Sequence, residues 1–349
     1  MRTGWVSRPW AGLDLGAYSV KLLALQPGVG VPRIAAVECP YPSPNRDSGP
    51  DPDAIAQAIS RCAERLELPL RSLRGLTLGI SGPDVIVKQI QLPLMDEAEV
   101  GSALRFEARK HLPFDPQTLV LDYQVLGRYV SERKVEVLLA AVSREHLDRQ
   151  VALLDRLGLR ADIVDAAPLA LANAALHEAG NDRTPQLLLD IGHTSSHFTL
   201  HQRGEPFFSR RFDFGGRHLT EAIARQLQVP FEEAEEWKLA AGSEEPGFRV
   251  EWNGRELQAV RQALEHDLVD EVRRSLAFYG TLGHLPESPR LLVSGATARL
   301  PGIAEQLAEL LQIPAAVFDP LADLGDSARA RIPGGPQFAQ ALGLALRTS

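Results

Sequence analysis

The sequence has little of what marks several large classes of protein. Only two cysteines occur in 349 residues, Cys39 and Cys62, too far apart in sequence for a CxxC motif or a metal pair. We interpret them as incidental thiols of a reducing compartment, which predicts a cytoplasmic protein. No apolar run approaches the roughly 20 residues that span a bilayer, and Asp14 interrupts the apolar stretch after the N-terminal arginines. The sequence therefore predicts neither a transmembrane segment nor a secretory signal.

Positive charge is also scarce. The 37 Lys and Arg residues are outnumbered by 45 Asp and Glu residues, so the net charge is −8. A general nucleic-acid-binding role is disfavoured, because such binding depends on basic side chains that neutralise phosphates. Hydrophobic residues make up 44% of the chain and charged residues 23%, which is the balance of a globular protein. The length allows two or three lobes, each with its own core.

Two short segments repeat one pattern. Asp14-Leu15-Gly16 and Asp190-Ile191-Gly192 each end an apolar run, and each precedes small or hydroxyl residues and a second apolar run. This pattern predicts a β-hairpin whose turn can hold a phosphate on its backbone N–H groups, while the Asp holds a hydrated divalent cation. One Asp-x-Gly turn would be common. Two copies, one in each half of the chain, indicate a duplicated fold in which both turns face one nucleotide.

The elements around the turns are predicted in a similar order in both halves. Strands are expected at residues 11–15, 20–25, 34–37, 76–80, 85–92, 119–126, 135–142 and 163–165, and again at 187–191, 197–200, 206–212 and 291–293. Helices are expected at residues 53–66, 97–111, 144–157, 169–177, 217–227, 231–241, about 257–276, from about 301, and 337–346. The predicted fold class is α/β, with two related lobes and a cleft between them.

Together these segments resemble the actin and sugar-kinase-like ATPase superfamily, which includes heat-shock chaperones and the division protein FtsA. Residues 14–19 are similar to its first phosphate motif, residues 190–195 to its second, and residues 291–296 to its adenosine motif. A closer resemblance, covering nearly the whole chain from about residue 10, is to the PilM family of type IV pilus assembly. The segments that carry this resemblance are residues 19–23, 106–114, 214–221, 273–279 and 341–347.

The resemblance implies an actin-like fold with duplicated ribonuclease-H-like lobes, at residues 10–180 and 181–349, and a subdomain inserted at about 84–160. It also implies ATP and Mg²⁺ between the lobes, and a scaffold at the inner membrane for pilus assembly and twitching motility. PilM proteins capture the cytoplasmic N-terminal tail of the membrane protein PilN and couple that platform to the cytoplasmic motor. The same partners are expected for this chain.

The candidate site residues follow from the two turns and from the resemblance. Asp14 and Asp190 are expected to hold Mg²⁺ through water, and Gly16 and Gly192 to let the backbone approach phosphate oxygens. Lys21 is expected either to contact a phosphate or to lie at a solvated strand edge. The residues expected to bind nucleotide are Asp14, Gly16, Ala17, Tyr18, Ser19, Lys21, Asp190, Gly192, Thr194, Ser195, Gly215, Gly216, Glu235, Lys238, Gly295 and Ala296.

Three features of this set leave room for more than one interpretation. The helix that follows Gly215-Gly216 either points its N-terminus at phosphates or is packed closely through these glycines. Tyr18 occupies a turn position where the superfamily usually has a small or hydroxyl residue, so its ring is expected to crowd the γ-phosphate. Ala296 stands where a second glycine is usual, and a positive φ there would lower stability and adenine affinity.

We expect ATP binding with slow hydrolysis or none. The superfamily positions the attacking water with a Glu or Gln just after the strand at residues 163–165, where this chain has Ala166 and Ala167. Asp165 is the one catalytic candidate nearby. The helix at residues 97–111 is predicted to form the partner groove, with Val100, Leu104 and Ala108 on one face and Arg105 on another. An extended tail would dock there or add a strand to an exposed edge.

Three other functions of the superfamily remain as alternatives. A small-molecule kinase needs a base for an acceptor hydroxyl, and no candidate beyond Asp165 is evident. An FtsA-like filament former would be expected to end in an amphipathic anchoring helix, whereas this sequence ends at Arg347-Thr348-Ser349. The cytoplasmic part of the type II secretion protein L is normally followed by a transmembrane span.

Overall fold

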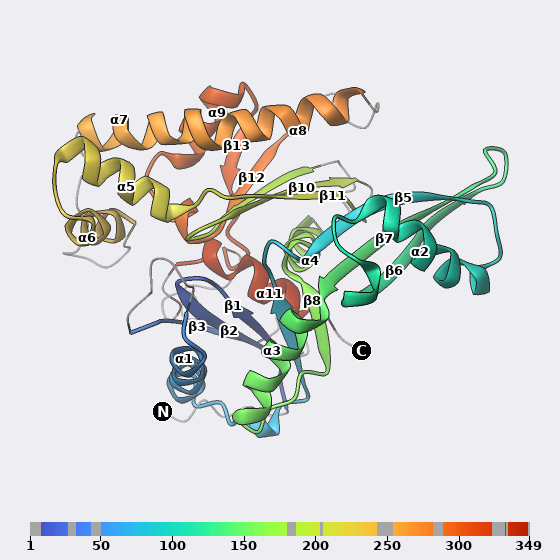
Figure 1. The fold of residues 1–349 in the computed structure, drawn as a ribbon. Helices are drawn as coiled ribbons and strands as arrows, with labels where there is room; N and C mark the ends of the chain where they lie inside the picture. The colour runs from blue at the N-terminus through green and yellow to red at the C-terminus, as the bar shows by residue number, and fades with distance from the viewer. Residues whose placement is uncertain are drawn as a thin grey trace.

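The computed structural model describes residues 8–26, 33–42, 50–179, 186–202, 205–242, 254–281, 289–322, 332 and 334–347. The expected division of the chain near residue 180 and its last two residues lie outside these ranges. Within them, the strands form one sheet of five strands and one of eight, with helices between and around the sheets (Figure 1). The fold is of the α/β class that the sequence predicts.

The five-stranded sheet belongs to the first half of the chain. Its strands are β1 (Trp10–Leu15), β2 (Ser19–Gln26), β3 (Arg33–Pro40), β4 (Gly75–Ile80) and β8 (Ile163–Ala166), in the order β3-β2-β1-β4-β8. The first three form an antiparallel meander, and β4 and β8 continue the sheet in parallel to β1.

The second half repeats this topology. Its strands are β9 (Gln186–Ile191), β10 (Ser196–Gln202), β11 (Glu205–Phe212), β12 (Leu291–Ser294) and β13 (Ala315–Val317). They lie in the order β11-β10-β9-β12-β13 with the same antiparallel and parallel pairings. The central strand of each set carries one predicted acid, Asp14 on β1 and Asp190 on β9, so the duplication inferred from the two turns is present in the topology.

Three more strands extend the second sheet beyond β11. They are β5 (Ile86–Pro93), β7 (Lys134–Ser143) and β6 (Leu119–Tyr129), and a single residue pair, Phe208 with Lys88, joins them to β11. Together with α2 (Glu97–His111) they project to the side of the two lobes (Figure 1). Asp96 begins α2 with a capping box to Glu99, which confirms the helix predicted there.

The predicted partner groove on α2 is corrected by its burial. Val100, Leu104 and Ala108 are buried in the core that α2 forms with β5, β6 and β7, whereas Arg105 is exposed. Apolar residues at steps of four on a helix form whichever face is buried, and here that face covers its own sheet. A partner therefore has no access to these three side chains in this structure.

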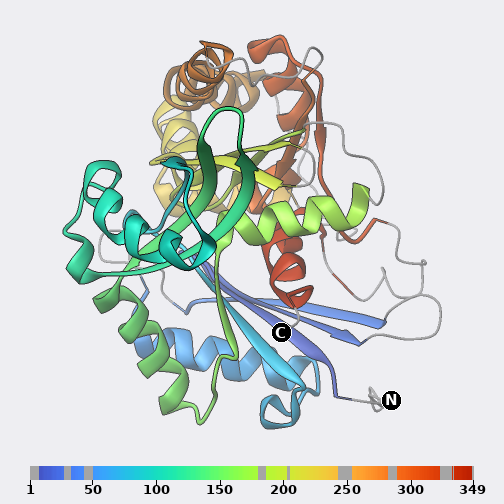
Figure 2. The same ribbon diagram turned by 90° about the vertical axis from the view of Figure 1, so that its right-hand side faces the viewer.

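Helices cover the outer face of each sheet and also fill the space between the two sheets. α1 (Pro52–Arg65) and α3 (Arg144–Arg156) cover the outer face of the first sheet, where Ile59 and Leu154 pack in the same core as Leu13. α4 (Ala167–Ala179) and α11 (Ala339–Ala345) lie between the sheets, in a core that includes Leu23 of β2 and Leu188 of β9. Figure 2 shows these two helices between the lobes from the side.

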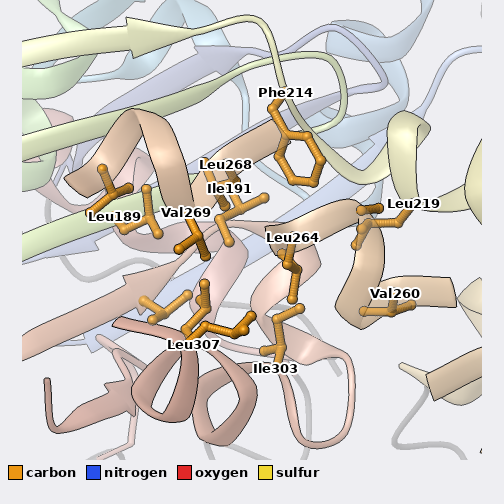
Figure 3. Close-up of a cluster of buried hydrophobic side chains, with 14 of the residues drawn as sticks. Leu189, Ile191, Phe214, Leu219, Val260, Leu264, Leu268, Val269, Ile303 and Leu307 are labelled. Atoms are coloured by element: carbon orange, nitrogen blue, oxygen red, sulfur yellow. The ribbon is translucent and has the colours of Figure 1, made fainter. Parts of the chain in front are cut away.

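The outer face of the second sheet carries the largest apolar core (Figure 3). Leu189 and Ile191 of β9 pack there against residues of several helices, including Leu264 and Leu307. The covering helices are α5 (Gly216–Leu227), α7 (Gly254–Ala263), α8 (Asp270–Thr281) and α9 (Ile303–Leu311). A π-helical segment, Leu264–Val269, joins α7 to α8, so the long amphipathic helix predicted at about 257–276 is one continuous rod. In the described part of the chain, no helix combines the length and the apolar character needed to cross a membrane.

Candidate nucleotide-binding site

Both predicted hairpin turns are present, and the same hydrogen bond closes each of them. The Gly16 N–H donates to the Ser19 carbonyl (N···O 3.1 Å), and the Gly192 N–H donates to the Ser195 carbonyl (3.0 Å). A Cβ on Gly16 would lie 3.1 Å from the Ser19 oxygen, and one on Gly192 would lie 2.9 Å from the Ser195 oxygen. A side chain at either position would therefore press on the turn that the hydrogen bond closes.

The two aspartates occupy equivalent register positions with different partners. Asp14 lies opposite Lys21 on β2, with its carboxylate 3.5 Å from the ammonium, and Asp190 lies opposite His197 on β10. Burial lowers the pKa of Lys21, but the nearby carboxylates, Asp14 first, outweigh burial and raise it overall. Burial lowers the pKa of His197 to about 4, so this ring is neutral at pH 7. The buried Lys21 is thus not at a solvated strand edge, and it is the cation that faces both aspartates.

Asp190 is held by two donors from distant parts of the chain. Ser294 donates its hydroxyl to Oδ1 (2.8 Å), and Gln340 of α11 donates its amide to Oδ2 (2.7 Å). Burial raises the pKa of Asp190 to about 6, an effect that the Ser294 hydrogen bond opposes and the charge of Asp14 increases. The carboxylate is therefore fixed in position, and its charge depends on pH in the physiological range.

The N-terminus of α5 supports the second turn. The Gly216 N–H donates to the Gly192 carbonyl (2.8 Å), and the Arg217 N–H donates to the His193 carbonyl (2.8 Å). A Cβ on Gly215 would lie 2.6 Å from the His193 carbonyl oxygen. These amides are therefore occupied by the turn, and of the two interpretations of Gly215-Gly216 the structure supports close packing.

Lys238 of α6 (Phe231–Ala241) is engaged by three oxygens. Its ammonium donates to the Gly216 carbonyl (2.9 Å), the Thr220 hydroxyl (2.7 Å) and the Glu235 carboxylate (2.7 Å), and Thr220 also donates to Glu235. Burial lowers the pKa of Lys238, and the Glu235 carboxylate only partly opposes this. The predicted pair Glu235 and Lys238 thus ties α6 to the start of α5 at the edge of the site.

The segment that resembles an adenosine motif makes a close approach to β9. Gly295 has a φ of +88°, and a Cβ there would lie 2.4 Å from the Ile191 carbonyl oxygen, so this position requires glycine. Ala296 begins a 3-10 turn, η4 (Ala296–Arg299), and is not among the residues with positive φ. The expected cost of alanine at position 296 therefore does not arise.

These elements enclose one cavity of about 310 Å³. All the predicted nucleotide-binding residues except Gly215 line it, so the structure brings together residues from the two turns, α5, α6 and η4. The cavity also contains side chains that the sequence did not single out: Glu38, His193, Thr297, Arg299, Gln337 and Gln340. His193 lies within the second predicted turn, and Thr297 directly follows the segment that resembles an adenosine motif, so the sequence did hold a signal for these two. The other four carry no local motif, because they reach the cavity only through the packing of distant segments.

Asp165, the catalytic candidate, does not line the cavity. It is buried at the end of β8, with its carboxylate 3.2 Å from the Arg347 guanidinium. Burial raises the pKa of Asp165, and Arg347 opposes this rise. The structure therefore gives Asp165 an ion pair with the segment after α11 and places it outside the cavity, which is a correction to its expected catalytic role.

The charges in the cavity suit a nucleotide that brings a divalent cation. The charged side chains in its lining are Asp14, Glu38, Asp190, Glu235, Lys21, Lys238 and Arg299. Four carboxylates against three cations leave little positive charge for a polyphosphate. In the residues that the structure describes, no group of three or more His, Cys, Asp or Glu side chains could hold a metal by itself. A divalent cation held mainly by phosphates and water would fit this lining, and Asp14 and Asp190 are the carboxylates that could contact its water ligands.

Nearly the whole chain is similar to proteins of a known family. The family described as type IV pilus assembly protein PilM matches residues 12–349. A solved PilM-PilN type IV pilus biogenesis complex is similar with a TM-score of 0.78 and 29% identity, covering 97% of this chain and 98% of that chain.

Two further relatives are more distant. The cell division protein FtsA of Neisseria meningitidis serogroup B (strain ATCC BAA-335 / MC58) is 24% identical over 329 residues, 84% of this chain and 78% of FtsA. MreB5 of Spiroplasma citri bound to ADP has a TM-score of 0.54 and 13% identity, covering 96% of this chain and 94% of that chain. These likenesses show the actin-like ATPase fold that the sequence predicts, and the family match extends over nearly all of the chain. The chain belongs to the PilM family of type IV pilus assembly proteins.

Proposed function

We propose that this protein is an ATP-binding scaffold of type IV pilus assembly that holds the N-terminal tail of a PilN-like inner-membrane protein. The observation that carries the nucleotide part is the single cavity into which both Asp-Gly turns open. The backbone of the two turns would hold the phosphates of ATP, and the segment at Gly295 would hold its base. Mg²⁺ would supply the positive charge that the cavity lacks, and Asp14 and Asp190 would hold its water ligands.

The protein binds ATP with slow hydrolysis or none. Hydrolysis requires an oriented water and a group that compensates charge in the transition state. The strand β8 ends at Ala166, α4 begins with Ala167, and the acid of this strand, Asp165, is paired with Arg347 outside the cavity. These observations support a nucleotide that stays bound between the turns, rather than one that is turned over.

The partner role rests on the family and on the similar PilM-PilN complex. Because Val100, Leu104 and Ala108 are buried, we assign the binding of the PilN-like N-terminal tail to the exposed part of residues 106–114. In this segment Phe106 is 67% exposed and Phe114 is 41% exposed. The pilus motor is the second partner, and membrane association follows from PilN. The domain division that we propose is residues 10–180 and 181–349, with the subdomain at about 84–160 as the part that presents this surface.

One set of binding measurements tests both parts. Calorimetric titration with MgATP is expected to show one site, which Asp14→Ala combined with Asp190→Ala abolishes. A synthetic peptide of the PilN-like N-terminal tail is expected to bind the wild type and to bind Phe106→Ala more weakly. Val130→Ala, which truncates a 73% exposed side chain in the turn after β6, is the matched control. Multiple turnovers of ATP onto a small-molecule acceptor would reject the scaffold in favour of a kinase.

A further inference from the structure

The two Asp-Gly turns, between β1 and β2 and between β9 and β10, contact each other through one side chain of each turn. The ring of Tyr18, from the turn between β1 and β2, packs on the ring of His193, from the turn between β9 and β10. Their centroids are 5.0 Å apart and their planes are inclined by 44°. Both side chains line the cavity. Because the turns belong to different lobes, this contact crosses the space in which the two turns face each other.

Each ring stands on a backbone that is held in place. The Tyr18 carbonyl accepts a hydrogen bond from the Tyr41 N–H (3.1 Å), and the Tyr41 hydroxyl donates to the Gly16 carbonyl (2.9 Å). The His193 carbonyl accepts from the Arg217 N–H (2.8 Å). The turns therefore cannot withdraw individually, and the rings separate only if a side chain rotates or if the lobes move apart.

The ring pair offers a phosphate little attraction. Burial, followed by the charge of Lys238, lowers the pKa of His193 to about 4, so the imidazole is neutral at pH 7. Burial raises the pKa of Tyr18, with the carboxylates of Glu235 and Glu38 adding to the rise, so its phenol stays protonated. A phosphate that enters between the turns meets two neutral rings in contact, and it must displace that contact without gaining a charge pair.

We propose that the Tyr18–His193 pair determines phosphate specificity: with the rings together the cleft takes a nucleoside diphosphate, and a triphosphate must separate them. This inference rests on the nucleotide-binding function proposed above. It assigns the pair a positioning role, since neither ring is given a part in bond breaking. A triphosphate brings one phosphate more to the turns than a diphosphate does, so the loss of either ring is expected to favour the triphosphate.

The test measures the affinities of MgATP and MgADP by calorimetry in five proteins: the wild type, Tyr18→Phe, Tyr18→Ser, His193→Ala and the Tyr18→Ser/His193→Ala double variant. Tyr18→Ser and His193→Ala are expected to raise the ratio of ATP to ADP affinity by up to about tenfold, the weight of one aromatic contact. Tyr18→Phe keeps the ring and is expected to keep the ratio. The double variant is expected to equal the single variants, because both delete the same contact.

A second readout needs no nucleotide. In protein labelled with ¹³C at histidine, the ring signals of His193, identified by their loss in His193→Ala, are expected to shift in Tyr18→Ser and to change little in Tyr18→Phe. Unshifted signals would overturn the proposal, as would an unchanged affinity ratio in both ring-deleting variants that bind nucleotide. Fully additive effects would also overturn it, because the rings would then act independently. Failure of every protein to bind either nucleotide would instead reject the proposed function, and this inference with it.

Discussion

At the residue scale, Asp190 is the group through which pH is expected to act on the site. Its pKa is about 6 in the folded protein against an ordinary value of 3.8. Between pH 3.8 and about 6, the folded state therefore binds a proton that the unfolded chain has lost. Its contribution to stability is therefore greatest at low pH and is lost as pH rises through about 6. In the proposed mode of nucleotide binding the preference is opposite, because Mg²⁺ and its water ligands would need the ionised carboxylate.

We therefore predict that MgATP affinity falls as pH is lowered through about 6, by up to about tenfold per pH unit for one linked proton. Calorimetry at several pH values measures this, and binding near pH 6 should release protons into the buffer. Asp190→Asn is expected to bind weakly with a flat profile between pH 5 and 8. A sloping profile in Asp190→Asn would assign the pH dependence to another group.

Exchanging glycine and alanine at two adjacent positions near β9 is expected to cost very different amounts of stability. Gly295→Ala places a Cβ 2.4 Å from a backbone oxygen at a φ of +88° and should destabilise the protein by about 2–4 kcal/mol. Ala296→Gly changes a position of ordinary φ and should cost no more than about 1 kcal/mol. Urea unfolding of both variants gives the comparison. Equal losses would contradict the close approach at Gly295.

The site residues that can be predicted from the sequence are those that lie next to each other in a short motif. Asp14, Gly16, Asp190 and Gly192 are recognisable because the turn and its acid are adjacent in the chain. Gln340 reaches Asp190 from a helix 150 residues away, and no short pattern encodes that approach. The sequence also treats the two cysteines as unrelated, yet burial and a hydrogen bond to Cys39 raise the pKa of the Cys62 thiol, so the two thiols lie together in the folded core.

At the element scale, helices are predicted well where their apolar period is strong, but the surface that each apolar face covers is not. The helix at residues 97–111 has the predicted bounds, and its stripe of Val100, Leu104 and Ala108 lies inside the subdomain. An apolar stripe on a helix predicts that this face is buried, but it does not predict which element packs against it. The α7–α8 rod and the strands of both lobes were likewise predictable, whereas the pairing of β5 with β11 depends on one distant contact.

The helices α4 and α11, which lie between the two sheets, cross each other closely. A Cβ on Gly343 of α11 would lie 1.7 Å from the Ala170 carbonyl oxygen of α4. Gly343→Ala is therefore expected to force the two helices apart and to lower the free energy of unfolding by about 3 kcal/mol, even though alanine is the better helix former. Denaturant unfolding monitored by circular dichroism measures the loss.

Gly254→Ala is the matched control for this helix contact. Gly254 begins α7, and a Cβ there meets nothing within 4 Å. The substitution is expected to leave stability unchanged or to raise it by up to about 1 kcal/mol, which is the intrinsic preference for alanine. If both glycine variants were stabilised alike, the close crossing of α4 and α11 would not exist in solution.

At the scale of the whole molecule, the duplicated lobes are symmetric in topology and asymmetric in charge. Each lobe contributes a turn, a central acid and a residue opposite that acid, but the first lobe has Lys21 where the second has the neutral His197. The cavity thus depends on both lobes at once, since Lys21 of one lobe faces the acid of the other. Separate lobes are not expected to bind nucleotide.

The proposed inserted subdomain is joined to the first lobe by two chain segments that are hydrogen-bonded to each other. Asp84, on the way in, accepts hydrogen bonds from the Ser143 hydroxyl and from His146 Nδ1 (2.8 Å), both on the way out. Ser81, three residues before Asp84, lines the nucleotide cavity. Burial raises the pKa of Asp84, but these hydrogen bonds outweigh burial and lower it overall, so the contact weakens in acid as the carboxylate is protonated.

Removing this contact should loosen the subdomain without unfolding the lobes. In Asp84→Ala, hydrogen exchange is expected to rise about tenfold in the backbone around residues 81–86 and 143–147, since a charged hydrogen bond is lost at a partly buried site. Protection in β1 and β9 should be unchanged. Asp148→Ala, which truncates an exposed acid on α3, the helix that carries His146, is expected to change neither region. Faster exchange throughout the molecule would mean that Asp84 stabilises the fold as a whole, whereas a local change would show that Asp84 holds these two chain segments together.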